Sequence, residues 1–150
     1  MLEAKKITTT DELEQALKIR RKVFVEEQGV PLEDEYDEFD KLNGKCDHIL
    51  VYYNGEPVGA GRVRSVEGYG KLERICILQE YRKFGLGKVI IAKLEEIAAE
   101  RGDSKVKLHG QTHAEGFYKK LGYETNSDVF MEDGIAHVLM TKKIGEKSQS

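Results

Sequence analysis

The 150-residue sequence predicts a single domain of the α/β (α+β) class, with a mixed, mostly antiparallel sheet flanked by helices. Two observations carry this prediction. The length is that of one ordinary domain, and 39% hydrophobic beside 34% charged residues is typical of a globular chain. Segments with strand and helix patterns also follow one another, in the order strand, one or two helices, three strands, helix, strand, helix and two strands.

A capping box marks the first helix, because Thr9 stands three residues before Glu12. Apolar residues then recur near the helical period, which predicts a helix over about residues 11–27. The segment Gly29-Val30-Pro31 ends it, since the residue before a proline avoids helical backbone angles.

An acidic segment, residues 33–40, follows this helix and contains six carboxylates. Such a run most often forms a solvated face. The alternative is that its charge attracts a cationic ligand. Both interpretations stay open at the level of the sequence.

Strand and helix patterns fill the rest of the chain. Turn signals at Asn54-Gly55 and Gly68-Tyr69-Gly70 separate the first strands, and Gly102 is placed to end a long amphipathic helix. The expected elements are strands over residues 48–53, 58–66 and 71–78, a helix that follows a loop at 82–87, a strand over 106–109, a helix over 114–121, and a hairpin of residues 123–130 and 135–142. Residues 145–150 are expected to form a polar tail.

Composition argues against several partners and locations. The net charge of −3 lacks the basic excess of nucleic-acid-binding proteins, and no apolar run approaches the ~20 residues that span a membrane. Two cysteines, Cys46 and Cys76, are too few for a disulfide framework and fit a reducing compartment. The N-terminal residues lack the apolar stretch of a signal peptide. We therefore expect a cytoplasmic protein without a nucleic-acid or membrane partner.

The stretch Arg82-Lys83-Phe84-Gly85-Leu86-Gly87-Lys88 combines glycines and cations between a predicted strand and a predicted helix. A helix N-terminus presents unpaired N–H groups and the positive end of the helix dipole, both of which suit a phosphate. Gly85 and Gly87 allow close backbone approach, and Arg82, Lys83 and Lys88 add positive charge. The alternative is a glycine-rich turn with solvated basic residues.

Two familiar phosphate-binding loops do not match this stretch. A Walker loop needs a glycine at position 82 and a serine or threonine at position 89, where this chain has Arg82 and Val89. A dinucleotide-binding loop needs a third glycine at position 90, which is Ile90.

Two motifs carry a resemblance to a known family. The Arg-x-x-Gly-x-Gly pattern of residues 82–87 resembles the acyl-CoA pyrophosphate loop of the GNAT acetyltransferase superfamily, and residues 114–123 are similar to its A-x-x-F/L-Y-x-x-L-G-F/Y element. The resemblance covers residues 7–143 and implies the GNAT acyl-CoA N-acyltransferase fold, as one domain over residues 1–144. Residues 20–31 and 132–137 resemble a bacterial, ElaA-like subgroup.

The resemblance implies an N-acetyltransferase that uses acetyl-CoA as co-substrate. The acetyl group would pass to a primary amine of a small molecule or peptide by direct attack in a ternary complex. Dimers are common in this fold, so a homodimer is one expectation. Two alternatives stay open: a non-catalytic acyl-CoA-binding module, and an acyl-transferring signal synthase, because residues 20–27 resemble N-acylhomoserine lactone synthases.

The resemblance also implies a set of cofactor-binding residues. The backbone of the strand before the loop pairs with the pantetheine arm, the loop holds the pyrophosphate, and the second motif flanks the thioester. The matching residues are Ile75, Cys76, Ile77, Arg82, Lys83, Phe84, Gly85, Leu86, Gly87, Lys88, Gln111, Phe117 and Tyr118. Gln111 stands where many members carry an asparagine, and Cys76 suits a small buried position better than a nucleophile.

Tyr118 matches the family tyrosine that gives a proton or hydrogen bond to the CoA sulfur. A phenol with a pKa of ~10 can assist a thiolate leaving group with a pKa of ~8.5. The alternative is that the Phe117–Tyr118 pair only packs a helix end.

Glu73 stands where many members carry a glutamate that deprotonates the amine. The alternative is an ion pair with Arg62, Arg64 or Arg74. Strand alternation predicts that Glu73 points to the same side as Ile75 and Ile77, which favours the role of base. His109 and His113 are the next candidates for a base. No spacing typical of metal ligands is present, so no metal site is expected.

Overall fold

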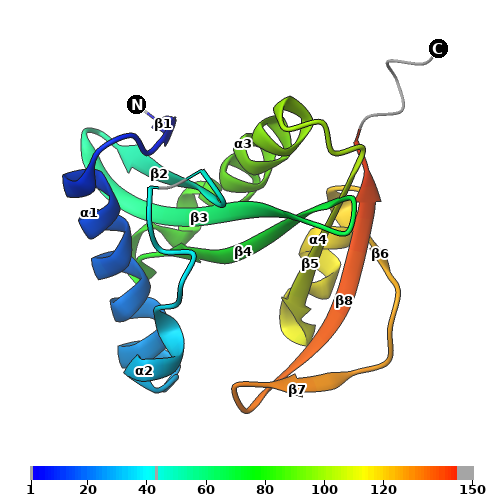
Figure 1. Cartoon of the computed structure of the whole chain (residues 1–150). Coiled ribbons are helices and arrows are strands. Elements are labelled where there is room, and N and C mark those ends of the chain that lie inside the picture. Colours follow the sequence, from blue (N-terminus) through cyan, green and yellow to red (C-terminus); the bar gives the residue numbers. More distant parts are fainter. Residues whose placement is uncertain (1, 43, 145–150) are drawn as a thin grey trace.

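The fold is described from a computed structural model, which covers residues 2–42 and 44–144 (Figure 1). The strands are β1 (Leu2–Lys6), β2 (Asp47–Tyr53), β3 (Glu56–Val66), β4 (Tyr69–Ile77), β5 (Lys105–Gln111), β6 (Glu124–Thr125), β7 (Phe130–Glu132) and β8 (Ile135–Lys143). The helices are α1 (Thr10–Arg20), the π-helix η1 (Arg21–Glu27), α2 (Leu32–Glu35), the 3-10 helix η2 (Gln79–Phe84), α3 (Leu86–Glu100), the 3-10 helix η3 (Thr112–Ala114) and α4 (Glu115–Lys120). None of the helices in these ranges is both long and apolar enough to cross a membrane.

The strands form one mixed sheet in the order β1-β2-β3-β4-β5-β8-β6, with β7 also paired to β8. Every pairing is antiparallel except that of β4 with β5. The parallel register joins residues 69–72 to residues 105–108, and both strands continue beyond it. Figure 1 shows the two strands diverging there. The divergence divides the sheet into an N-terminal and a C-terminal half.

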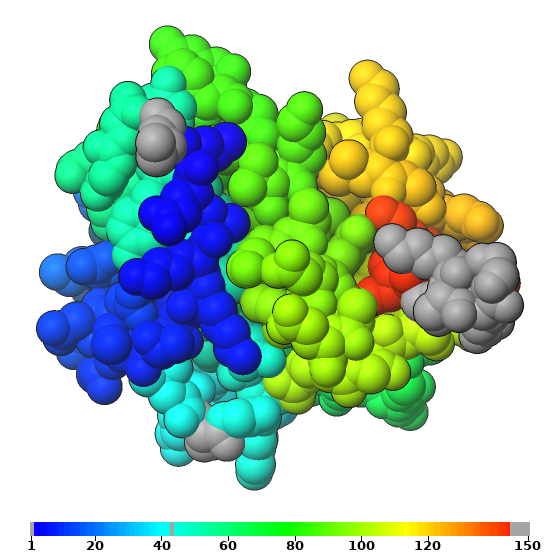
Figure 2. All heavy atoms as spheres, turned by 90° about the horizontal axis from the view of Figure 1, so that it is seen from above, coloured from blue at the N-terminus to red at the C-terminus, as the bar shows by residue number. Residues whose placement is uncertain are grey.

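Helices cover both faces of the sheet. On one face, α3 packs the buried side chains of Ile90, Leu94 and Ile97 against a core that includes Leu72 and Leu108. On the other face, α1 contributes a smaller core together with Leu50, Ala60 and Cys76 from the strands. Viewed from above, the N-terminal segments and the C-terminal strands lie on opposite sides of the middle of the chain (Figure 2). Burial of these apolar stripes stabilises the fold.

A β-bulge in β4 overturns the expected orientation of Glu73. Arg62 of β3 lies opposite Glu73, whereas Ala60, two residues earlier, lies opposite Cys76, so β4 holds one extra residue. Arg74 accommodates it with a left-handed backbone (φ of 57°). The extra residue reverses the alternation, so Ile75 and Ile77 pack on the α3 side while Glu73 meets Arg62 on the α1 side.

Most other predicted elements are present within a few residues of the expected positions, including the Thr9–Glu12 capping box. The first helix differs because its second half is π-helical over Arg21–Glu27. The strand expected over residues 123–130 is broken into β6 and β7. Between them the hydroxyl of Ser127, which is exposed, accepts a hydrogen bond from the Leu139 N–H. The polar tail expected at 145–150 lies outside the described residues.

Gly70→Ala should destabilise the protein by roughly 1–3 kcal/mol through overpacking. A Cβ atom at position 70 would lie 2.7 Å from the Cβ of Ala98, between α3 and the sheet. Gly116→Ala is the matched control, because no atom lies within 4 Å of the Cβ position in helix α4. It should be neutral or stabilise by up to ~1 kcal/mol. Urea unfolding followed by circular dichroism measures both, and equal effects would contradict the packing argument.

Candidate active site

A cleft of about 450 Å³ opens where β4 and β5 diverge. Its walls come from η1, β4, the start of α3, β5, α4 and the β7–β8 hairpin. Of the residues implied by the resemblance, the cleft is lined by Glu73, Ile75, Cys76, Ile77, Arg82, Gly85, Gly87, Gln111, Phe117 and Tyr118. Lys83, Phe84, Leu86 and Lys88 do not line it. The tertiary structure therefore brings the two sequence motifs together at one site.

Gly85 and Gly87 serve different purposes at the start of α3. Gly85 has a left-handed backbone (φ of 73°), which joins η2 to α3 and which side chains adopt at a cost. At Gly87 the Phe117 ring occupies the space that a side chain would need, because a Cβ atom there would lie 2.9 Å from the ring. The first glycine shapes the turn, and the second admits the ring of α4 beside the helix N-terminus.

The Arg82 side chain is already paired. Its Nη1 and Nη2 donate to Glu27 at 2.6 Å and 2.7 Å, and its Nε donates to the Ile77 carbonyl at 3.0 Å. The hydrogen bond raises the pKa of Arg82 and lowers the pKa of Glu27. Arg82 thus ties the loop to η1 and β4 at once.

Other side chains of this loop are engaged in packing. The Phe84 ring stacks on Tyr53 with centroids 4.5 Å apart, and the Lys83 ammonium lies 5.5 Å from the Phe84 ring centre. Leu86 is fully buried in the core under the sheet. Lys88 is exposed in the first turn of α3, so it leaves a cation beside the helix N-terminus.

Tyr118 projects from α4 into the cleft on the α3 side of the sheet. Its ring lies 3.2 Å from the Cβ position of Gly110 and packs edge-on against Phe117 and Tyr123. Burial raises the pKa of its phenol, so the hydroxyl stays protonated at neutral pH. Within residues 2–42 and 44–144 the hydroxyl has no hydrogen-bond partner. It is therefore available to a ligand.

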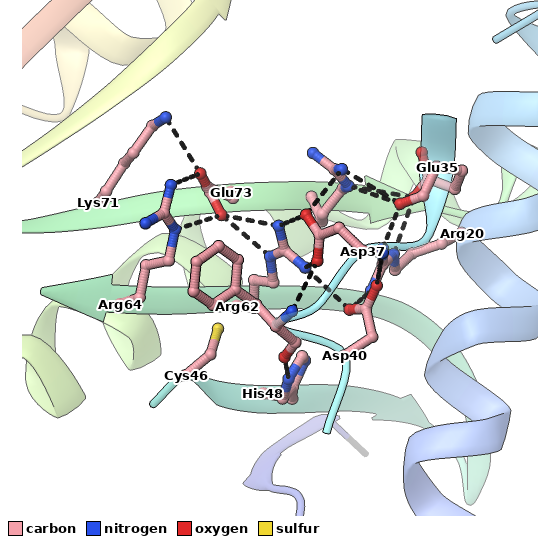
Figure 3. Close-up of polar contacts among 12 residues, drawn as sticks. Arg20, Glu35, Asp37, Asp40, Cys46, His48, Arg62, Arg64, Lys71 and Glu73 are labelled. Atoms are coloured by element: carbon pink, nitrogen blue, oxygen red, sulfur yellow. Dashed lines mark hydrogen bonds and ion pairs between the residues drawn. The ribbon is translucent and has the colours of Figure 1, made fainter. Parts of the chain in front are cut away.

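Glu73 lies in a buried network of charges centred on Arg62 (Figure 3). Arg62 is 1% exposed and donates to Asp37 at 2.7 Å, to Asp40 at 2.8 Å and to Glu73 at 3.0 Å. Glu73 also pairs with Arg64 at 3.2 Å and with Lys71 at 3.1 Å. Three cations therefore surround one carboxylate.

This environment favours the ion-pair interpretation of Glu73 over the role of base. Burial raises the pKa of Glu73, but the hydrogen bond from Arg64 and the charges of Arg62 and Lys71 outweigh it and lower the pKa to about 2. A carboxylate this acidic takes a proton from an ammonium group poorly. Arg74, the third partner considered from the sequence, instead donates to the Glu35 carbonyl.

The acidic segment is docked by the same network. Arg20, also buried, donates to Glu35 at 2.8 Å and to Asp40 at 2.6 Å. Asp37 and Asp40 then bridge to Arg62 (Figure 3). Half of the six carboxylates are thus used internally, so the segment is neither a solvated face throughout nor a free cluster of negative charge.

The cleft is also lined by polar residues whose hydrogen-bond partners the sequence did not predict. Gln111 donates to Gln28 of η1 at 3.2 Å and accepts from His113 at 2.6 Å, which joins the end of β5 to the opposite wall. His109 lies 2.8 Å from Glu132 of the β7–β8 hairpin. Local sequence patterns do not predict the contacts of Gln28 and Glu132, because their partners are far away in the chain. In the described ranges no cluster of ligands could hold a metal ion.

The network predicts acid sensitivity. The pKa values of Asp37 and Glu73 are each lowered to about 2, below ordinary values of 3.8 and 4.5. A carboxyl group whose pKa is lowered in the folded state stabilises the fold at a pH above its ordinary pKa. This contribution is lost as the pH falls from about 4.5 through 2. Thermal unfolding followed by circular dichroism should show a melting temperature that drops across this window.

Arg62→Met should cost roughly 3–5 kcal/mol at pH 7, because it leaves buried carboxylates without their cation. It should also reduce the acid dependence. Lys93→Met, which removes an exposed ion pair with Glu96, is the control and should change stability by less than ~1 kcal/mol. Equal effects of the two substitutions would contradict the network's role.

Comparisons with known proteins agree with this geometry. The acetyltransferase (GNAT) domain model matches residues 8–144. The YyaT protein of Bacillus subtilis is 62% identical over 140 residues, which are 93% of this chain and 95% of YyaT. The YjcF N-acetyltransferase of the same organism is 47% identical over 133 residues, 88% of this chain and 93% of YjcF.

Structural similarity points the same way. The crystal structure of Escherichia coli ElaA superposes with a TM-score of 0.84 at 28% identity, over 95% of this chain and 100% of ElaA. The expected GNAT fold is therefore confirmed, and so is the resemblance to the ElaA-like subgroup. The chain belongs to the GNAT acetyltransferase family and is an acyltransferase.

Proposed function

We propose that the protein transfers the acetyl group of acetyl-CoA to a primary amine, by direct attack within a ternary complex. One observation carries the proposal: a single cleft contains both the N-terminus of α3 and the free hydroxyl of Tyr118. The PaiA N-acetyltransferase of Thermoplasma acidophilum and an aminoglycoside 6'-N-acetyltransferase share the fold, each with a TM-score of 0.71, at 17% and 15% identity. Both were solved with coenzyme A, which supports the choice of cofactor.

The cofactor would bind along the α3 side of the gap between β4 and β5. Among the described residues no strand pairs with β4 on the β5 side beyond Leu72, so the backbone of residues 75–77 can pair with the amide groups of a pantetheine arm. The pyrophosphate would meet the N–H groups of the first turn of α3, with Lys88 adding charge. Arg82 would hold the loop in place through Glu27.

The chemistry requires a neutral amine and a protonated leaving group. Nitrogen attacks the thioester carbonyl, a carbon–nitrogen bond forms, and the carbon–sulfur bond breaks with its electron pair moving to sulfur. Tyr118 would donate its proton, or a hydrogen bond, to that sulfur. Holding both substrates in one cleft supplies much of the rate by proximity. A free tyrosine hydroxyl in the cleft favours this catalytic assignment over a binding module without turnover.

Two further expectations remain proposals. The free cysteines Cys46 and Cys76 are both buried, which fits the reducing cytoplasm. A homodimer stays a prediction from the family, and its measurement is the molar mass in solution.

Acetyl-CoA should bind the wild-type protein, with an affinity that falls as salt rises because the pyrophosphate contacts are charged. Gly85→Val should weaken binding most, since a β-branched residue resists the left-handed backbone of the turn. Phe84→Ala is the control and should bind nearly as wild type, because this ring stacks on Tyr53 and does not line the cleft. Calorimetry measures all three, and absence of binding at millimolar acetyl-CoA would overturn the proposal.

Tyr118→Phe should lower kcat and kcat/KM together by ~10²–10⁴, the usual value of general acid help. Acetyl-CoA affinity and the melting temperature should stay unchanged, since the hydroxyl has no partner to lose in the described part of the chain. Thiol release from acetyl-CoA with a panel of polyamines, amino sugars and peptides measures the rate. A variant within about twofold of wild type, far below the general-acid range, would remove Tyr118 from the mechanism.

A further inference from the structure

The acetyl transfer proposed above still needs a base for the amine, and the acceptor side of the cleft supplies a candidate. His109 is on β5, where Leu108 pairs with Leu72 as the last step before the two strands diverge. Leu108 and Gly110 face α3 and Tyr118, so alternation turns His109 to the opposite, α1 side. His109 and Tyr118 therefore approach one cleft from the two faces of the sheet.

The hydrogen bond to Glu132 fixes the tautomer of His109. The His109 Nδ1 lies 2.8 Å from Oε1 of Glu132. This bond lowers the pKa of Glu132, so the carboxylate is ionised and can only accept. Nδ1 must then carry the hydrogen, which leaves a lone pair on Nε2 in the neutral ring.

The surroundings keep this imidazole in place without occupying Nε2. The Phe130 ring packs edge-on against it with centroids 5.1 Å apart, and 30% of the side chain remains exposed. In the part of the chain that the structure describes, Nε2 has no hydrogen-bond partner. The lone pair is thus available at the cleft.

Other titratable groups around His109 are less suited to the role. His137 of β8 is 8% exposed and donates through Nδ1 to the Ile135 carbonyl, and its Nε2 lies 4.0 Å from Glu132. Glu73 and Lys71 of β4 are paired with each other. Lys107 of β5 lies 5.1 Å from the Tyr69 ring centre. His113 also lines the cleft, but its Nε2 is held by the neutral amide oxygen of Gln111. Among the residues described, only His109 lines the cleft and combines a free Nε2 with a carboxylate partner at Nδ1.

We propose that His109 is the general base of the acetyl transfer and that Glu132 is its positioning residue. This proposal rests on the proposed function. Nε2 takes one proton from the bound ammonium, directly or through one water, and later releases it to solvent. The neutral nitrogen attacks the thioester and loses a second proton as the amide forms. Tyr118 gives its proton to the departing sulfur and is restored by that second proton, so protons balance.

His109→Asn is the decisive variant, because asparagine retains an N–H donor for Glu132 but has no basic nitrogen. Turnover at pH 7 should fall by ~10²–10⁴ while acetyl-CoA affinity stays at the wild-type value. The pH profile should change in shape. The wild-type kcat/KM should level off at a lower pH than that of the variant, whose rate should rise about tenfold per pH unit until the unbound ammonium itself has lost its proton.

Lys107→Gln, two residues away on the same strand, is the matched control and should keep the wild-type rate and profile. Glu132→Gln should reduce turnover less than His109→Asn, because the amide oxygen can still accept from Nδ1 but no longer carries a charge that holds the ring in one tautomer. Spermidine, glucosamine and a short peptide with a free N-terminus serve as acceptors. A His109→Asn enzyme with the wild-type rate and profile would overturn the assignment of the base, and a Glu132→Gln enzyme with the wild-type turnover would overturn the positioning role.

A nitrogen NMR titration of the histidine rings tests the pair without any acceptor. Neutral His109 should be protonated at Nδ1 in the wild type and should lose this preference in Glu132→Gln. A ring protonated at Nε2 would overturn the proposal. Failure of the proposed function has a different signature, namely wild-type protein that shows no acetyl-CoA binding by calorimetry, and the NMR result still decides the pair in that case.

Discussion

The end of parallel pairing between β4 and β5 is the constraint on which the rest of the site depends. Backbone groups require partners, and in the described residues β4 and β5 stop pairing with each other after Leu72 and Leu108, so the backbone of each strand lacks a strand partner along the gap. In the proposed function, a polar, extended ligand of the pantetheine type would pair with this open backbone. The bulge at Arg74 falls directly after this point, and it turns the following residues of β4 so that Ile75 and Ile77 close the α3 side.

Buried ion pairs stabilise the opposite, α1 side of the sheet. Arg20 and Arg62 are each 1% exposed, and such buried cations persist only when they are paired. Their partners come from the segment between α1 and β2, which the ion pairs hold against the sheet as a wall of the cleft. Glu73 completes the network. Its low pKa follows from the cations around it, and the proposed mechanism assigns the base to His109, outside this network.

In the proposed mechanism one face of the sheet binds the thioester and the other face binds the amine. The α3 side offers the helix N-terminus, the open backbone of β4 and Tyr118, all suited to a phosphorylated thioester. The α1 side offers the docked acidic segment and the His109–Glu132 pair, suited to an amine. In that mechanism the gap between the strands would be the route by which the nitrogen reaches the thioester.

Features with local causes could be predicted from the sequence by itself. The capping box, the strand and helix periods and the glycine turn before α3 depend on neighbours within a few residues, and the two motifs identified the family and several of the cleft-lining residues. The tertiary structure decided what depends on distant partners: the bulge that reverses the direction of Glu73, the pairing of Arg82 with Glu27, and the meeting of His109 with Glu132. Alternation along a strand is a rule for regular pairing, and only the register with β3 reveals an extra residue. The charge state of a carboxylate is likewise set by the cations folded around it, which no local pattern specifies.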